Sequence, residues 1–566
     1  VVINGDPSFD NRAVGFGVGG NWTANIHVDL SSRDTTVIFN GDGAQTIGGL
    51  STTTFANFIV NKPSGTTLTL AHEQEINNGN LTVTSGTLDL SSFTMHRVSN
   101  GGVLTVADEA FLKIGGTNTF PVRYLNHLLR ATSTVEYYGT TQVVTSELYG
   151  HLILSGSGNK TMQTALPLIT HGNFAMSGTA SFTLAGLMRV DGNFTLNANT
   201  TFGAGVFSQS FRGNFSNSGT FNAGASTSTF DGTSAQTIGG SNSTAFNALT
   251  ILNSSGVVLN GVDTTVNSTL RFTSGTITTG TNKVIIPLGG NVVRSSGHVV
   301  GNLQKYFYSG APSATFEVGS ATAFTPVSVL FAALSVPGNL IASTTTGDHP
   351  NIGSSKINPA KTANRHWTLT NSGIVFANYN ATFNFVSADL DAGANTANFI
   401  VGRFSSGWTY PPVSTKSPTS TQATGITGFG NFQLGESAGS PSVGLVKSVS
   451  PTGIQPPGTD LAYSVVFTNS GSGIAASVEI SDPIPPNTDY KVGSETHNVG
   501  TSGLAVAVTY SNDGGVSYTY APVSSGGGAP AGYDRNVTNI RWTFTGSLTQ
   551  ISPNNSGTVS FTARIR

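Results

Sequence analysis

The sequence predicts an all-β protein in three parts, a β-solenoid followed by two β-sandwiches. Three observations carry this prediction. Short runs of alternating apolar and polar residues recur along the whole chain, turn signals of Gly with Asn or Ser separate them, and similar units repeat in the first half. The predicted boundaries are 1–287 for the solenoid, 288–436 for the first sandwich, 437–443 for a linker and 444–566 for the last domain.

The solenoid is predicted from a fine period. Gly-Asn-Phe begins at Gly172, Gly192 and Gly213, in steps of 20 and 21 residues. One such coil cannot bury its apolar side chains alone, whereas stacked coils share one continuous core. Stacked strands lie about 4.8 Å apart, so roughly a dozen coils would make a rod on the order of 60 Å long. The alternative is a string of separate sandwiches that share similar hairpins.

A longer repeat overlies this period. Thr36–Gly49 (TVIFNGDGAQTIGG) and Ser228–Gly240 (STFDGTSAQTIGG) are its clearest copies, and a worn copy begins at Thr134 (TVEYYGTTQVV). These motifs resemble the repeat stretches of large secreted proteins in Bacteroidota-like bacteria. The resemblance implies a secreted protein.

The middle part loses the period, and its strands are longer. They include Ala314–Gly319, Arg365–Asn371, Asn380–Val386 and 398–404. Ordinary loops separate them, and Trp367 and Trp408 are expected in the core between two sheets. The Gly/Ser/Pro-containing stretch 437–443 is expected to be a linker.

The last part is predicted to be an immunoglobulin-like sandwich. Leu461–Asn469 alternates strictly, with Leu461, Tyr463, Val465 and Phe467 on one face. A Pro-rich segment at 481–490 ends a strand, and further short strands follow at the regular spacing that is typical of this fold.

This last unit also closely resembles the DUF11 family of bacterial and archaeal surface-protein repeats. The matching segments include Pro457-Gly458-Thr459, Thr468-Asn469-Ser470-Gly471, Asp482-Pro483-Ile484-Pro485, 510–515 and Ile540-Arg541-Trp542. The resemblance implies an immunoglobulin-like fold on large extracellular proteins, without catalytic residues.

Composition excludes several classes of function. Charged residues make up 9% of the chain, against roughly 25% in ordinary soluble proteins. The net charge is −2 and no basic stripe is present, so nucleic-acid binding is not expected. The chain has no cysteine, which excludes disulfides and thiolate metal sites. It also has no apolar stretch long enough to span a membrane.

Candidate chemistry is sparse. Solenoids also host polysaccharide-active enzymes, which need paired carboxylates, and Glu73 with Glu75 is the best pair available. No catalytic site is expected from it. Asp389 and Asp391 stand at alternate positions before Gly393, as in part of a calcium-binding loop, although a plain turn is favoured. No other cofactor is expected.

The sequence therefore favours a non-catalytic extracellular structural protein, a subunit of a self-assembling surface filament, sheath or layer. Strands at the two ends are candidates for pairing with identical subunits, through Val1, Val2 and Ile3 and through Val559, Phe561 and Ile565. The alternative is that each strand pairs within its own domain.

A second hypothesis is a cell-surface adhesin that binds glycans or surfaces. It would need exposed aromatic side chains, and its candidates are Trp22, Tyr137, Tyr138 and Tyr149, for which core packing is an equal explanation. A β-helix polysaccharide-active enzyme is the third and least favoured hypothesis.

Overall fold

The computed structural model describes residues 1–4, 15–163 and 166–566, and 54% of the chain is strand against 2% helix. Contacts divide it into two compact units. Unit 1 holds 1–349, 363–390 and 403–434, and unit 2 holds 350–362, 391–402 and 435–566. The helices of the described residues are single 3-10 turns, and none is long and apolar enough to cross a membrane. These turns are Ser31–Arg33, Ile352–Ser354, Ser387–Asp389 and Thr396–Asn398.

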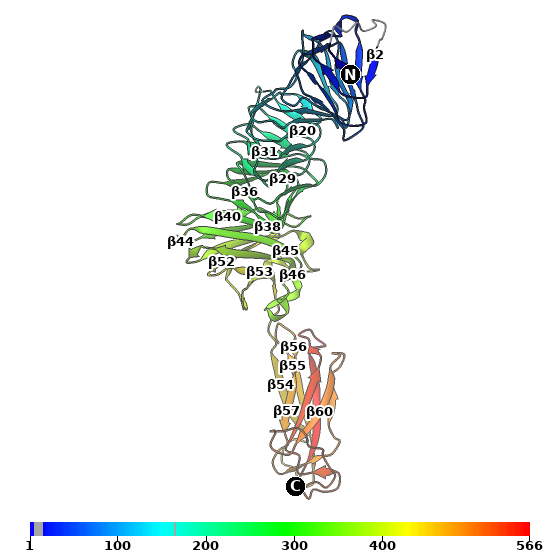
Figure 1. Cartoon of the computed structure of the whole chain (residues 1–566). Helices are drawn as coiled ribbons and strands as arrows, with labels where there is room; N and C mark the ends of the chain where they lie inside the picture. The colour runs from blue at the N-terminus through cyan, green and yellow to red at the C-terminus, as the bar shows by residue number, and fades with distance from the viewer. Residues whose placement is uncertain (5–14, 164–165) are drawn as a thin grey trace. The chain divides into compact units, whose positions relative to one another are not determined.

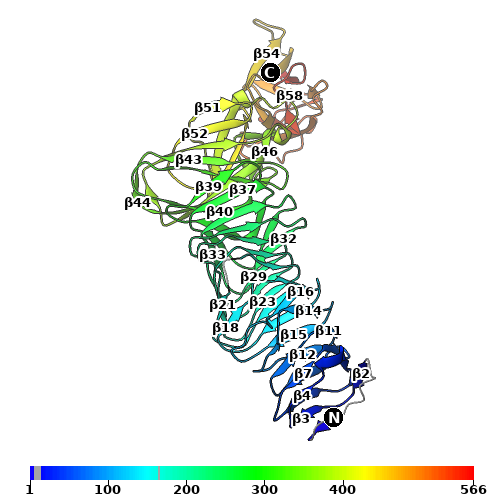
Figure 2. The same cartoon turned by 90° about the horizontal axis from the view of Figure 1, so that it is seen from above.

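The first part of unit 1 is the predicted β-solenoid, and it has about 15 turns, somewhat more than the dozen expected. Most coils contribute one strand to each of three faces, and the strands of successive coils pair in parallel (Figures 1 and 2).

The first face contains β1 (Val2–Ile3), β3 (Trp22–Ala24), β6 (Gln45–Gly49), β9 (Thr67–Leu70), β12 (Thr87–Asp89), β15 (Phe111–Ile114), β17 (Thr134–Tyr137), β20 (His151–Leu154), β23 (Phe174–Met176), β26 (Phe194–Leu196), β29 (Phe215–Asn217), β32 (Gln236–Gly239) and β35 (Val257–Asn260).

The second face contains β4 (Val28–Asp29), β7 (Thr53–Phe55), β10 (Gln74–Ile76) and β13 (Met95–Arg97), then β18 (Gln142–Val144), β21 (Asn159–Met162), β24 (Ser181–Thr183), β27 (Thr201–Gly203), β30 (Thr220–Asn222), β33 (Thr244–Phe246) and β36 (Thr264–Val266).

The third face contains β2 (Gly15–Val18), β5 (Thr36–Phe39), β8 (Asn57–Asn61), β11 (Leu81–Ser85), β14 (Gly101–Val106) and β16 (Tyr124–Leu129), then β19 (Leu148–Tyr149), β22 (Leu168–Thr170), β25 (Met188–Val190), β28 (Gln209–Phe211), β31 (Thr227–Phe230), β34 (Ala248–Leu252), β37 (Thr269–Ser274) and β39 (Asn291–Arg294).

The solenoid contains a break that the sequence did not predict. The second face changes sheet between β13 and β18, and the third face changes sheet between β16 and β19. Only the first face runs through, because β17 pairs with both β15 and β20. The coil at this point is short: Thr134 is in register with His151, 17 residues on, whereas Phe174 is in register with Phe194, 20 residues on. Further along, β33 and β36 of the second face join the sheet of the first face through β38 (Ile277–Ile286).

The Gly-Asn-Phe repeat has a distinct structural use for each residue. Phe174, Phe194 and Phe215 stack in register in the core, with ring centroids 5.2 and 5.0 Å apart. The side chain of Asn193 accepts a hydrogen bond from the backbone N–H of Asn214 (2.9 Å), and Asn173 accepts one from Asn193 in the same way (2.9 Å). The glycines allow neighbouring coils to approach each other closely, since a Cβ at Gly213 would lie 2.2 Å from the oxygen of Gly192.

The solenoid passes into the first sandwich without a gap in strand pairing. β38 (Ile277–Ile286) pairs in parallel with β40 (Val299–Phe307), which also pairs in parallel with β42 (Val318–Gly319). Parallel pairing thus continues beyond residue 287. β40 then pairs antiparallel with β45 (Gly338–Thr346), and β45 pairs antiparallel with residues 365–371 of β46 (Ile357–Ser372).

A second, five-stranded sheet covers these strands. Its order is β41 (Ser313–Phe316), β43 (Val327–Phe331), β48 (Tyr379–Asn384), β52 (Ser420–Ile426) and β51 (Val413–Ser417). Trp367 is buried between the layers, where its ring packs on Phe383 at 5.3 Å and its indole N–H donates to the oxygen of Thr325 (3.0 Å). Trp408 was expected in the same core, but it is only half-buried, because it lies in a short hairpin of β49 (Phe399–Phe404) and β50 (Trp408–Thr409).

The C-terminal part of unit 2 is the predicted immunoglobulin-like sandwich, built of antiparallel strands. One sheet has the order β54 (Val443–Ser450), β55 (Asp460–Asn469), β64 (Ser556–Ile565), β58 (Thr488–Lys491) and β61 (Tyr533–Asp534), with β59 (Thr496–Asn498) beside β64. The other has the order β57 (Glu479–Pro483), β62 (Asn539–Thr545) and β60 (Ala505–Ser511), and β56 (Ala475–Ala476) pairs separately with β63 (Ser547–Leu548). Trp542, Phe467 and Phe561 are fully or almost fully buried between the sheets.

Candidate functional site

The two carboxylates considered for catalysis are surface residues of the solenoid. Glu73 and Glu75 are both exposed on the second face. Glu73 accepts hydrogen bonds from the backbone N–H (2.9 Å) and the hydroxyl (2.5 Å) of Thr94. Glu75 lies in register with His96 on the next coil. The nearby Arg123 donates instead to the backbone oxygen of Val98 (2.8 Å). Glu73 directly precedes β10 and Glu75 lies within it, and both are exposed surface residues.

The residues considered for calcium are engaged by protein groups. Asp389 is buried and accepts two hydrogen bonds of 2.9 Å from the guanidinium of Arg365, which is also buried. Asp391 accepts hydrogen bonds from the backbone N–H (2.7 Å) and hydroxyl (3.1 Å) of Thr362. Within the part of the chain that the structure describes, no three His, Asp or Glu side chains are grouped so as to hold a metal ion.

The aromatic residues considered for adhesion are mostly in the core. Trp22, Tyr137 and Tyr149 are completely buried, and the hydroxyls of the two tyrosines lie 3.1 Å apart. Tyr138 is half-buried and donates a hydrogen bond to Asp89 (2.7 Å).

The two terminal strands differ in their surroundings. Val559 and Phe561 are buried in β64, which pairs with β55 on one side and with β58 and β59 on the other, and Ile565 is half-buried at the end of that strand. In β1, Val2 is exposed and Ile3 is buried, and Val1 before the strand is exposed. β1 pairs with β3, and among the described residues no strand pairs with its other side.

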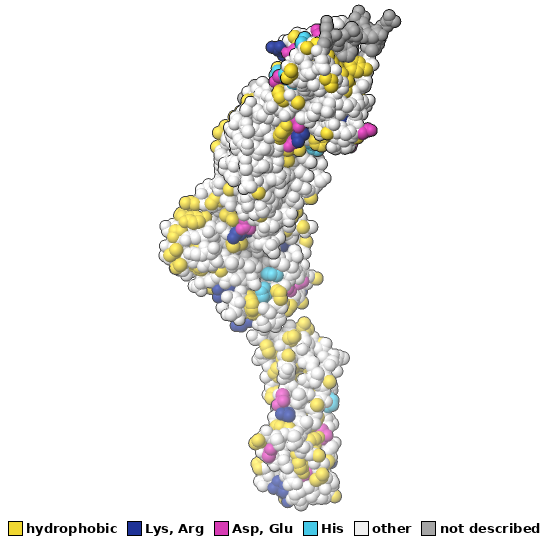
Figure 3. Space-filling view, viewed as in Figure 1, with side chains coloured by type: hydrophobic (Ala, Val, Ile, Leu, Met, Phe, Trp, Pro, Cys, Tyr) yellow, Lys and Arg dark blue, Asp and Glu magenta, His cyan; other side chains and the backbone are white. Residues whose placement is uncertain are grey.

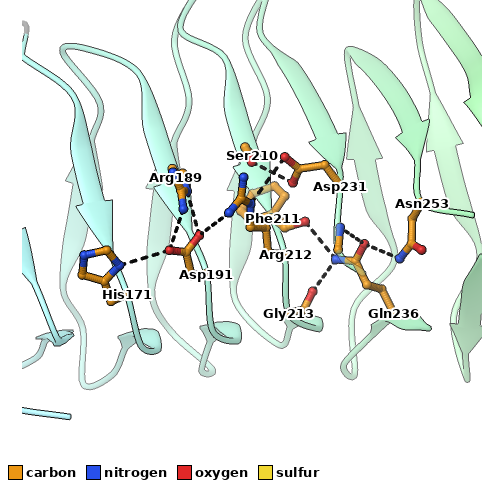
Figure 4. A network of polar contacts seen from close by, with 11 residues as sticks. His171, Arg189, Asp191, Ser210, Phe211, Arg212, Gly213, Asp231, Gln236 and Asn253 are labelled. Carbon is orange, nitrogen blue, oxygen red and sulfur yellow. Dashed lines mark hydrogen bonds and ion pairs between the residues drawn. The ribbon is translucent and has the colours of Figure 1, made fainter. Parts of the chain in front are cut away.

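A polar node that recurs inside the solenoid was not predicted. The glutamine at one equivalent position in each copy of the long repeat is buried: Gln45, Gln142 and Gln236. The side-chain oxygen accepts from the backbone N–H of a nearby Gly (2.9–3.1 Å), and the side-chain nitrogen donates to backbone oxygens of the preceding coil. Figure 4 shows this arrangement for Gln236 with Phe211 and Gly213. The node fixes one coil to its neighbour.

The next coil supplies a buried donor to each glutamine. Lys62 donates to Gln45 (2.7 Å), Lys160 donates to Gln142 (2.9 Å), and Asn253 donates to Gln236 (2.9 Å). Lys160 also donates to the backbone oxygens of Gly139 (2.7 Å), Thr140 (2.6 Å) and Ser157 (3.2 Å).

These four acceptors of Lys160 are all neutral oxygens. Burial lowers the pKa of Lys160 to about 8. Burial also lowers the pKa of Lys62, and the charge of Asp42 opposes this with a smaller effect.

A second polar network lies on the third face and crosses several coils (Figure 4). Asp191 accepts hydrogen bonds from Arg189 (2.7 and 2.9 Å), lies within 3.5 Å of Arg212, and contacts the ring of His171 (3.2 Å). The arginines and aspartates pair with one another, and Figure 3 shows few charged side chains on the visible surface, several of them as neighbouring basic and acidic groups.

Two histidines come together in the sandwich. The rings of His349 and His366 lie 5.4 Å apart, and those of Phe404 and Trp408 lie 4.7 and 5.3 Å from His349. Asn431 donates to His349 Nε2 (3.1 Å). Burial and, to a smaller extent, the neighbouring His366 lower the pKa of His349. The four rings form a packed aromatic cluster.

β54 is an exposed edge strand of the last domain. It pairs with β55 along its whole length, from Val443 to Ser450, and among the described residues no strand pairs with its other side. Seven of its eight residues are exposed, including Leu445 (55%) and Val446 (69%). Large apolar side chains on an unpaired strand are uncommon, because such an edge invites pairing with another chain.

A groove of about 340 Å³ runs beside this strand. Val443 and Leu445 line one side, and Val478 and Ile480 line the other, at the edge strand β57. Glu479, between them, also lines the groove and is paired with Arg541 (3.7 Å). Lys447 is the one charged residue of β54, and it is neutralised by Asp482, 2.5 Å away. The site thus combines unpaired main-chain groups with an apolar groove, which is the surface that an added β-strand needs.

Comparison of the chain with protein-family models, with curated proteins and with solved structures finds no match. The resemblance of the last domain to the DUF11 family, and that of the repeats to secreted bacterial proteins, therefore remain predictions.

Proposed function

We propose that the chain is a non-catalytic extracellular structural protein, a subunit of a self-assembling surface filament, sheath or layer. The observation that carries the proposal is the exposed, unpaired and apolar strand β54, which can take a strand from a second copy of the chain. The extracellular location is supported by the DUF11 resemblance. The surface, with only 9% charged residues in the chain, offers little repulsion between copies.

A symmetric pairing of two β54 strands suits the sequence of this edge. A two-fold axis perpendicular to the sheet and passing through Val446 sets Val446 against its own copy and Leu445 against Lys447 of the other copy. No two like charges then face each other. Because residues 443, 445, 447 and 449 lie on one side of the strand, the two apolar grooves also lie on the same side of the joined sheet.

An assembly that grows beyond a dimer needs a second contact. Unit 1 has a candidate at the first coil of the solenoid, where β1, β2 and β4 are the first described strands of their faces. Val1 and Val2 are exposed there. Stacking of a second copy on these edges would continue the ladder of coils.

The decisive variant is Val446→Lys. In the symmetric pairing it sets two lysines against each other at the centre of the contact, so the dimer should weaken by about tenfold or more. Val446→Glu on its own should weaken the dimer to a similar extent. An equimolar mixture of the two variants should restore pairing, because Lys of one chain then faces Glu of the other. The matched control is Val516→Lys, which adds the same charge at another exposed site in the same domain (87% exposed).

Analytical ultracentrifugation of the wild type and each variant measures the association, and negative-stain microscopy shows its form. Wild-type chains that stay monomeric at high concentration would refute assembly. Assembly that is unaffected by Val446→Lys, or a mixture of variants that fails to recover, would refute the β54 contact.

A further inference from the structure

The five-stranded sheet of the first sandwich carries a polar groove on its outer face. Figure 2 labels β43, β52 and β51 in this sheet, in which β48 lies between β43 and β52. Its inner face is apolar: Val329, Phe383 and Ala423 are buried. The outer face holds a groove of about 460 Å³, within the size range of small-molecule sites. Its polar side chains come from Ser313, Thr315, Ser328, Asn380, Thr382 and Gln422.

The strand register arranges these side chains in two rows. Thr315, Ser328, Thr382 and Gln422 are cross-strand neighbours and form a row across four strands. The second row, Ser313, Leu330 and Asn380, crosses three strands. Neighbouring strands are about 4.8 Å apart and residues on one face are about 7 Å apart along a strand, so the groups form a flat array.

Hydrogen bonds within the first row hold its members in place. The hydroxyls of Thr315 and Ser328 lie 2.8 Å apart, and Gln422 Nε2 donates to the hydroxyl of Thr382 (3.1 Å). The other side of the Gln422 amide accepts from Ser414 (2.7 Å). Each of these bonds uses only part of the capacity of the group, because a hydroxyl has one donor and two acceptor positions.

The second row offers a further unused donor. Asn380 accepts a hydrogen bond from the backbone N–H of Gly425 (3.1 Å), which orients its amide. Its side-chain nitrogen has no partner among the described residues. Leu330, between Asn380 and Ser313 in this row, is 47% exposed and gives the groove an apolar surface.

We infer that this groove binds a neutral saccharide. No charged side chain lines it, so an ionic ligand would meet no counter-charge. An apolar ligand would leave a row of hydroxyl and amide groups without partners. A neutral saccharide presents hydroxyls to the polar rows and a C–H face to Leu330. This is a binding function in addition to the proposed assembly, and it uses a different part of the chain.

Isothermal titration of the full-length chain with neutral hexasaccharides of glucose, mannose, galactose and xylose tests the inference. At least one of them should bind saturably. Thr382→Val and Asn380→Ala should each weaken binding about tenfold, the effect of losing one or two hydrogen bonds to a ligand. Both side chains are only half-buried, and Gln455→Ala in unit 2 is the amide control and should bind as the wild type does.

Three outcomes would overturn the inference. They are no binding by any of the sugars at millimolar concentration, equal binding by wild type and both groove variants, or binding only by a charged polysaccharide or an extended peptide. Thermal unfolding checks that each variant is folded. The Val446→Lys chain should bind sugar normally, so loss of assembly and loss of sugar binding are separate results.

Discussion

Replacing Lys160 by Met tests the role of the buried polar nodes. The substitution keeps a long apolar chain and removes the amine. The oxygens of Gly139, Thr140 and Gln142 then each lose a donor at 2.6–2.9 Å. The oxygen of Gln142 keeps the N–H donor of Gly139 (2.9 Å) and the oxygen of Gly139 keeps the N–H donor of Ser157 (3.2 Å), so no acceptor of these two is left without a partner. The loss of the charged donor therefore predicts a decrease of about 1–3 kcal/mol in the free energy of unfolding.

The size of this loss should depend on pH. Burial lowers the pKa of Lys160 to about 8, below its ordinary value of 10.5 in the unfolded chain. Between these values the unfolded state binds more protons than the folded state, so this residue makes the protein more stable as the pH rises from about 8 to about 10.5. Met has no such titration. The difference between wild type and Lys160→Met should therefore grow over that range.

Urea unfolding followed by far-UV circular dichroism at pH 7, 8, 9 and 10 measures both effects in the solenoid transition. Lys160→Asn is the matched control, because Asn253 fills the same position in the third node and donates to Gln236 and to the oxygen of Ser234. Lys160→Asn should lower the free energy of unfolding by less than Lys160→Met does. A Met variant as stable as the wild type, or a difference that shrinks from pH 8 to pH 10, would refute the argument.

Three further predictions concern the core and the acidic residues. Phe194→Ala removes the central ring of the phenylalanine stack and should lower the free energy of unfolding by about 3–5 kcal/mol. Hydrogen exchange should become faster in coils 170–235 but not in 443–566, because a coil contacts only its neighbours. A uniform increase in exchange along the chain would contradict this prediction. Asp389→Asn breaks the paired bonds to buried Arg365 and should cost about 3–5 kcal/mol in thermal unfolding; an unchanged midpoint would argue against it. Calcium chelation should leave the wild-type midpoint unchanged, because Asp389 and Asp391 already bind protein groups; a clear rise on adding calcium would reveal a site.

Much of the fold follows from local patterns in the sequence. The Gly-Asn-Phe period predicts the stacked coils because each of its residues has one role at the same corner of successive coils. Gly allows the coils to approach closely, Asn forms a ladder of side-chain hydrogen bonds, and Phe places a ring in the core. The alternation in Leu461–Asn469 likewise predicts which side chains are buried, as Val465 and Phe467 are. Both signals are local, so a single sequence reveals them.

Other features depend on which strands become neighbours. The break in the solenoid follows β16, whose neighbour in the next coil belongs to a different sheet, although Tyr124–Leu129 looks like any other strand in sequence. The alternation of Val559–Ile565 fits an edge strand and a strand paired on both sides equally well. The structure shows that β64 is paired on both sides. Lys62 looks like a solvated strand end, and its burial follows only from Gln45 in the coil before it.

The polar nodes also bear on how so repetitive a chain finds one alignment. Coils of nearly equal length and similar apolar content can slip past each other by a whole coil with little loss of core contact. A slipped stack would leave Gln45, Gln142 or Gln236 inside the core without its donor, at a cost of a few kcal/mol for each unpaired group. The three glutamines are spaced 97 and 94 residues apart, so they destabilise every misaligned stack relative to the correct one. A single buried asparagine fixes the alignment of a coiled coil in the same way.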